Sequence, residues 1–215
     1  MSSAVHFQCE ELGSTASSRI FPPYCKKCQT PPVSLESQMP VPTLHPEFSS
    51  LLAASHLGAV PLSWIPASEV PQPYQKLLVH DHDMTSELAA FHGDSISLTV
   101  LRSQLDDPIY LREVTLHAAS SGTTVEYGVI EILLDSLPPE LRPRILAGDT
   151  PLGTILTTSG LHFHSEPQGF FTIPSQKLES IFLQSPSGKI LFGRYNHLVT
   201  DELKILARIL EILPY

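Results

Sequence analysis

The sequence has few cysteines and few basic residues. Its three cysteines, Cys9, Cys25 and Cys28, all lie near the start of the 215-residue chain, so a disulfide framework cannot hold the remainder together. Lys and Arg number 13 against 22 Asp and Glu, and a net charge of -9 disfavours contact with a phosphate backbone. We therefore predict that nucleic acid is not a partner.

Long apolar runs and targeting signals are also missing. No uninterrupted apolar stretch approaches the roughly 18 residues that a membrane-spanning helix needs. The first residues show neither the basic nor the apolar region of a secretory signal. These features predict a cytoplasmic protein that does not bind membranes. Because 42% of the residues are hydrophobic and 16% are charged, most of the chain is expected to fold.

Common catalytic and metal-binding motifs are absent or incomplete. The sequence has no GxSxG, HExxH, P-loop or GxGxxG string. Cys25 and Cys28 have the spacing of zinc ligands, but a second such pair is lacking. The His-x-His pairs at 80–82 and 162–164 would place both imidazoles on one face of a strand, yet ten histidines make chance pairs expected. We predict that the protein uses no metal and no cofactor.

Composition divides the chain near residue 46. Residues 1–46 hold seven of the 20 prolines, which favours polyproline or irregular backbone and predicts a proline-rich arm. Residues 47–215 show helical and strand periodicity and are predicted to form one domain.

The periodicity predicts an α+β fold in which helices flank an antiparallel sheet, on one side of it. The helices are expected at residues 48–57, 84–92 (with Thr85 as N-cap and Gly93 as the end), 137–146 and 201–213. The strands are expected at residues 95–102, 109–118, 124–134, 177–184 and 189–199. The apolar stripe of the last helix would pack on the sheet, although it could also serve a homodimer.

Several polar residues fall on apolar strand faces. Arg112 shares its face with Tyr110, Val114 and Leu116, and an inward guanidinium suits a carboxylate, which could belong to Glu126, to Glu131 or to a ligand. The alternative is an arginine that reaches solvent along its aliphatic stem.

Two further strands carry arginines on apolar faces. Arg102 ends the strand face that carries Ile96, Leu98 and Val100. Arg194 and Asn196 lie on a mostly apolar face of the strand at 189–199, which suggests a polar patch in a pocket wall unless a bulge at Gly193 reverses the assignment.

Five segments, in this order and at these separations, resemble the chorismate lyase family: LLVHDHDMT, SISLTVLRS, IYLREVTLHA, DTPLGTIL and SGKILFGRYNHLV. The resemblance spans roughly residues 74–200. It implies a single α+β domain with an antiparallel sheet of about six strands and a small ligand cavity that flap-like helical segments close. It also implies elimination of pyruvate from chorismate without metal or cofactor. An arginine that falls on Arg112 would grip the ligand carboxylate, and main-chain groups at Met84 and Leu152, in the turn that includes Gly153, would hold the ligand.

The sequence departs from the family at its catalytic glutamate. That acid falls on Asn196 or on Tyr195, depending on the alignment, and neither side chain is an efficient general acid near neutral pH. The candidate replacements are Glu126, Glu131, His162 and His164. The LHFHSEPQGFF segment, rich in aromatic residues and histidine, looks like an insertion suited to a different ligand.

We therefore predict a cofactor-free lyase, cyclase or isomerase that transfers a proton on a small anionic or enolic natural-product intermediate. Arg112 would hold the anion, Asn196 and Tyr195 would bind the reacting oxygen, and His162 or His164 would act as acid or base. The remaining substrate-binding residues are predicted to be Met84, Arg102, Leu152, Gly153, Glu126 and Arg194.

Two alternatives stay open at this point. One is an ordinary chorismate pyruvate-lyase that makes 4-hydroxybenzoate. The other is a noncatalytic module that binds a small ligand, since the same fold serves as the effector-sensing domain of transcription regulators. The proline-rich arm is too short and too acidic for the helix-turn-helix head that such regulators carry.

Overall fold

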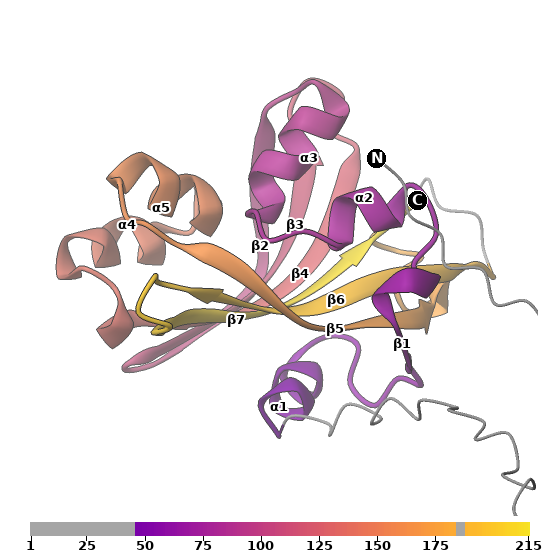
Figure 1. Ribbon diagram of the computed structural model, residues 1–215, viewed down its shortest axis with the longest axis horizontal. Helices are drawn as coiled ribbons and strands as arrows, with labels where there is room; N and C mark the ends of the chain where they lie inside the picture. Colours follow the sequence, from indigo (N-terminus) through magenta and orange to yellow (C-terminus); the bar gives the residue numbers. More distant parts are fainter. Residues whose placement is uncertain (1–45, 184–187) are drawn as a thin grey trace, which may run out of the picture. The chain divides into compact units, whose positions relative to one another are not determined.

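A computed structural model describes residues 46–183 and 188–215 of the chain (Figure 1). The predicted arm, apart from its last residue, and the Cys25–Cys28 zinc hypothesis lie outside the described residues. The domain boundary near residue 46 stays a prediction.

Seven antiparallel strands form one sheet in the order β1-β5-β6-β7-β4-β3-β2. The strands are β1 (Ser63–Ile65), β2 (Ile96–Asp106), β3 (Ile109–Ala118), β4 (Thr124–Leu133), β5 (His164–Pro174), β6 (Ile190–Val199) and β7 (Ile205–Leu213). The helices are α1 (Pro46–Ala54), α2 (Tyr74–Leu78), α3 (Met84–His92), α4 (Arg142–Ala147) and α5 (Leu152–Ser159). Four 3-10 turns complete the described elements: η1 (Ala67–Glu69), η2 (Leu134–Ser136), η3 (Pro139–Leu141) and η4 (Ser175–Lys177). The predicted α+β class is confirmed, with seven strands instead of about six.

Helices cover both faces of the sheet, whereas one covered face was predicted. Phe48 and Leu51 of α1 pack against Tyr127, Tyr195 and Leu210 on one face. The other helices lie across the opposite face, where the core contains Leu88 of α3 and Leu156 of α5, among others (Figure 1). Alternate residues of the strands point to this second face, and they include the buried polar side chains of Arg112, Glu126 and Glu211.

Helix α3 has a well-defined start and end. Its N-cap is Asp83, whose side chain accepts a hydrogen bond from the Ser86 N–H at 3.0 Å, so the prediction of Thr85 as N-cap was wrong by two residues. Gly93 ends the helix in the left-handed conformation, with φ of 61°, as predicted.

The predicted C-terminal helix is in fact the strand β7. This strand lies between β6 and β4 in the middle of the sheet, and both of its faces are mostly buried. A strand that is buried on both faces is apolar almost throughout, and such a run cannot be distinguished from a buried helix by periodicity. The helical dimer interface suggested by this stripe therefore does not exist.

The predicted strand at residues 177–184 was also wrong. The described part of this segment is the turn η4 followed by irregular backbone, and Leu178 and Phe182 are buried as single anchors in the core. The neighbouring sheet strand is instead β5, which contains most of the apparent insertion LHFHSEPQGFF and pairs with β1 and β6. This segment is a structural strand of the sheet.

Candidate functional site

A pocket lies between the second face of the sheet and the N-termini of α3 and α5. Alternate residues of two neighbouring strands form its floor: Arg112, Val114 and Leu116 of β3, and Glu126, Gly128 and Ile130 of β4. Met84 and Leu152 contribute from the two helix N-termini. The cavity has a volume of about 50 Å³, which is several times the roughly 10–15 Å³ that one water molecule needs. A small ligand therefore suits it.

Arg112 is buried in this pocket. The residue is only 2% exposed, and its Nε and Nη1 atoms have no hydrogen-bond partner within the described part of the chain. Burial lowers the pKa of its guanidinium. The proposed internal partners do not pair with it, because Glu131 forms an ion pair with Arg208 and no ion pair joins Arg112 to Glu126 among the described residues. The solvent-reaching alternative is excluded by the burial of the side chain.

Two carboxylates line the same pocket. Glu126 of β4 is 4% exposed, and burial together with the charge of Glu211 raises its pKa well above the usual range, although Arg194 acts in the opposite direction. Glu211 of β7 is 3% exposed and forms an ion pair with Nε of Arg194. Gly128 lies beside Glu211 in the register, and a Cβ atom there would lie 3.1 Å from Oε1 of Glu126. The missing side chain keeps the floor open between these groups.

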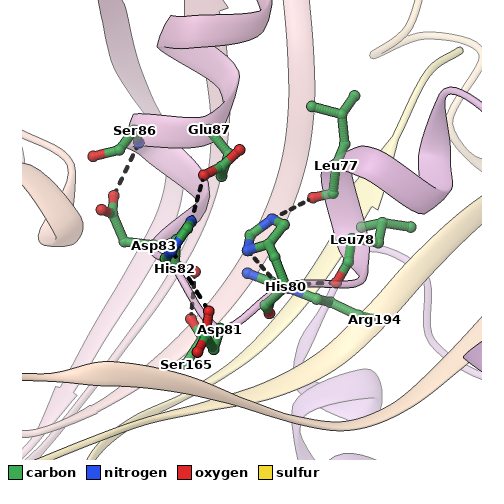
Figure 2. A network of polar contacts seen from close by, with 10 residues as sticks. All are labelled: Leu77, Leu78, His80, Asp81, His82, Asp83, Ser86, Glu87, Ser165 and Arg194. Atoms are coloured by element: carbon green, nitrogen blue, oxygen red, sulfur yellow. Dashed lines mark hydrogen bonds and ion pairs between the residues drawn. The ribbon is translucent and has the colours of Figure 1, made fainter. Parts of the chain in front are cut away.

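Arg194 joins the sheet to the segment that precedes α3. Its Nη1 atom donates to the backbone oxygens of Leu78, at 3.0 Å, and of His80, at 3.3 Å (Figure 2). His80 in turn lies with Nε2 at 2.7 Å from the Leu77 oxygen, and burial followed by the charge of Arg194 lowers its pKa. A neutral His80 that donates to Leu77 fits beside the guanidinium. Nε and Nη1 of Arg194 thus bind protein groups, whereas Nε and Nη1 of Arg112 have no partner in the described residues.

Asn196 and Ser165 fasten the same segment. The Ser165 N–H donates to the Asp81 oxygen and its hydroxyl donates to the His82 oxygen, each at 2.8 Å (Figure 2). Asn196 is fully buried and donates to the Ser165 hydroxyl at 3.1 Å. Its side chain therefore holds the backbone that leads into α3.

Arg102 lies on the other face of the sheet. A bulge between Val100 and Arg102 shifts the register, so that Val100 pairs with Val114 of the pocket but Arg102 pairs with Glu113. Arg102 forms an ion pair with Glu113 at 3.3 Å beside the end of α1. The predicted grouping of Arg102 with the pocket-facing residues was wrong for this reason.

Four of the predicted catalytic residues lie outside the pocket lining: Asn196, described above, and Tyr195, His162 and His164. Tyr195 packs on Phe48 of α1, and its pKa is raised to about 12 by burial. His162 is exposed, and His164 lies 3.6 Å from Glu166 at the start of β5. The pocket lining thus contains five of the predicted site residues: Met84, Arg112, Glu126, Leu152 and Gly153.

The histidine pairs do not form a larger ligand cluster in the described residues. The rings of His80 and His82 are stacked with centroids 6.0 Å apart, and His82 Nδ1 lies 2.7 Å from Glu87. No group of three or more His, Cys, Asp or Glu side chains within residues 46–183 and 188–215 is arranged to hold a metal ion.

The sequence did not reveal Glu211 as a pocket residue, and the structure gives Gly153 a role in helix packing that was not predicted. Glu211 was hidden because its strand was assigned as a helix; it is the single acidic residue within β7 and could have been noticed as such. At Gly153, a Cβ atom would lie 2.5 Å from Oδ1 of Asp83, so glycine lets the N-terminus of α5 approach that of α3. Both helix N-termini can therefore border the same pocket.

Comparisons with known proteins give structural likenesses only. No protein-family model matches the sequence, and neither does a curated protein. PhnF from Mycobacterium smegmatis has a TM-score of 0.47 at 14% identity over 61% of this chain and 63% of that chain, so the match spans less than two thirds of PhnF. The effector domain of PhnF gives 0.46 at 12% identity over 62% of this chain and 88% of that domain. The ligand-binding domain of a GntR-family transcriptional regulator from Bordetella bronchiseptica gives 0.40 at 9% identity, over 55% and 85%.

The prediction of a lyase, cyclase or isomerase is corrected by these findings. The similar structures include an effector domain and the ligand-binding domain of a transcriptional regulator. The geometry agrees, because Asn196, Tyr195, His162 and His164 do not line the pocket around Arg112. What is established is an α+β domain with one antiparallel sheet flanked by helices. No helix in the described residues has the length and apolarity to cross a membrane.

Proposed function

We propose that this domain is a noncatalytic module that binds a small carboxylate in the pocket between the sheet and the N-termini of α3 and α5. The observation that carries the proposal is the environment of Arg112. This residue is 2% exposed, and its Nε and Nη1 atoms have no hydrogen-bond partner in the described residues. A buried guanidinium without a counter-charge is costly, and a carboxylate matches its planar fork. A bound anion would therefore satisfy the pocket.

The roof of the pocket supports the same ligand chemistry. Helix α5 begins at Leu152, and no side chain caps its N-terminus. The first backbone N–H groups of a helix lack intrahelical partners and favour anions. Leu152 and Gly153 bring this end of α5 to the pocket that contains Arg112. The arrangement supports a chorismate lyase-like fold that is used for binding.

The rest of the lining favours an apolar ligand body. Val114, Leu116, Ile130, Leu198 and Ile209 surround the space between the polar groups. Burial of apolar surface contributes to binding at about 25 cal/mol per Å². The ligand is therefore a compact carboxylate with an apolar part, and its small size follows from the small pocket.

Calorimetry with a panel of small carboxylates, from acetate to benzoate, tests the proposal. We expect at least one to bind the wild type, and Arg112→Met to weaken it at least tenfold, since about 1.4 kcal/mol corresponds to tenfold. Arg102→Met is the matched control, because this arginine lies on the other face, and it should bind as the wild type does. NMR of the recovered ligand should show no conversion. Binding that survives Arg112→Met would refute the proposal.

A further inference from the structure

The pocket has a second polar end, distant from Arg112. The register pairs Arg112 with Ile130 and Leu116 with Glu126, so the two charged residues lie four positions apart along the strands. Four residues of strand span roughly 13 Å. Gly128 lies between them, and the absence of a side chain there leaves the floor continuous. One ligand can therefore extend from Arg112 toward Glu126.

Glu126 faces the pocket with an unused oxygen. Its Oε2 atom is buried and has no hydrogen-bond partner in the described residues. Glu211 of β7 and Arg194 of β6 act on it electrostatically, and it acts in turn on Tyr215 at the end of the chain. The remaining titratable groups nearby are Asp83, which lines the pocket from the start of α3, and Tyr74 of α2, which interacts with Tyr215. No cation is paired with Glu126 in the described residues, since Arg194 is paired with Glu211.

The charges around the pocket favour a neutral Glu126 when a ligand is bound. The buried charged groups at the pocket are Arg112 and Arg194, with two positive charges, and Glu211, with one negative charge, whereas Asp83 is half-buried and caps α3. With Glu126 protonated, this group has one net positive charge, which a monoanion neutralises. A dianion, or an ionised Glu126 beside a monoanion, would leave a buried negative charge uncompensated, and such a charge is costly.

We propose that the carboxyl group of Glu126 is a second recognition group, which donates a hydrogen bond to a neutral oxygen at the end of the ligand opposite its carboxylate. The inference rests on the proposed function and restricts the class of ligand. The ligand class becomes a small monocarboxylate with a neutral acceptor oxygen, and dicarboxylates are excluded. Binding is then linked to the proton on Glu126.

Three probes of similar length separate these features: butanoate, succinamate and succinate. Each carries one carboxylate for Arg112, and the other end is a methyl group, a neutral amide or a second carboxylate. We expect succinamate to bind the wild type at neutral pH about fivefold more tightly than butanoate, which cannot accept a hydrogen bond, and at least tenfold more tightly than succinate, which is a dianion.

Two variants of Glu126 test its role. Glu126→Gln keeps a donor of similar shape and should keep the succinamate affinity, whereas Glu126→Leu should remove the preference for succinamate over butanoate. In the wild type, succinamate affinity should fall by up to tenfold per pH unit above the pKa of Glu126 in the free protein, because the proton must then be taken up. Glu126→Gln should not show this loss. Unfolding curves of each variant provide the folding control.

The outcomes distinguish this inference from the proposed function. If succinate binds as tightly as succinamate, or if Glu126→Leu leaves succinamate binding unchanged, the role of Glu126 is refuted while an Arg112-dependent site remains. If none of the three probes binds, or if Arg112→Met binds all of them as the wild type does, the carboxylate site itself is refuted.

Discussion

Two buried arginines on the same face of the sheet provide a direct test of what each one does. Both side chains are buried: Arg112 is 2% exposed and Arg194 is 0% exposed. Arg194 is paired with Glu211 and bonded to the oxygens of Leu78 and His80. Arg112 lacks partners on Nε and Nη1 in the described chain. Replacement of each by methionine should therefore have opposite effects on stability.

The expected magnitudes follow from the partners that each change leaves behind. Arg194→Met removes the counter-charge of a buried carboxylate, which typically costs about 3 to 5 kcal/mol of unfolding free energy. Arg112→Met leaves no buried group unpaired and removes the desolvation penalty of an unsatisfied charge, so it should stabilise the ligand-free protein by about 1 to 3 kcal/mol. For a domain of this size, 1 kcal/mol corresponds to about 2 to 4 °C in Tm.

Urea unfolding of the two variants and the wild type, without added carboxylate, measures these differences. Circular dichroism and intrinsic fluorescence should give the same transition, which supports a two-state treatment. An Arg112→Met variant that loses stability to the same extent as Arg194→Met would show that Arg112 has a structural partner, and the reasoning for a ligand site would fail.

Three further predictions concern other parts of the site. Gly128→Ala should weaken binding of small carboxylates in calorimetry at least tenfold, because its Cβ would lie 3.1 Å from Oε1 of Glu126 and 3.2 Å from Cγ2 of Val114; unchanged affinity would mean that the ligand does not occupy this floor. Asp83→Ala should lower the unfolding free energy by about 1 kcal/mol through loss of the α3 cap, and an unchanged denaturation midpoint would contradict this. The raised pKa of Glu126 stabilises the folded state at low pH, and this contribution is lost as pH rises from about 4.3, the unfolded value, through the folded value. The stability of the wild type relative to Glu126→Gln should therefore fall across that window by up to about 1.4 kcal/mol per pH unit, and a pH-independent difference would show that Glu126 titrates normally.

The sequence predicted local features well where alternating residues or turn residues mark an element. The strands β3 and β6, the hairpins that join β2, β3 and β4, and the end of α3 at Gly93 were found because alternation and turn residues are local signals. The assignment of Arg112 to an inward face had the same basis. The strand β7 could not be found in this way, since its apolar residues also fit a helical period and one of its two neighbours, β4, is distant in the sequence. The position of Glu211 in the pocket was lost with it.

Periodicity alone also could not separate the arginines by role. Arg102, Arg112 and Arg194 all followed apolar alternation in the sequence, yet they now occupy three different environments. One bulge turns Arg102 to the opposite face, where Glu113 pairs with it. The register of β6 against β7 places Arg194 directly beside Glu211, whereas the register of β3 against β4 places Arg112 beside Ile130, which offers no acceptor. Since cross-strand neighbours decide whether a buried charge is satisfied, the pairing of strands, and not the sequence of any one strand, leaves Nε and Nη1 of Arg112 without a partner in the described residues.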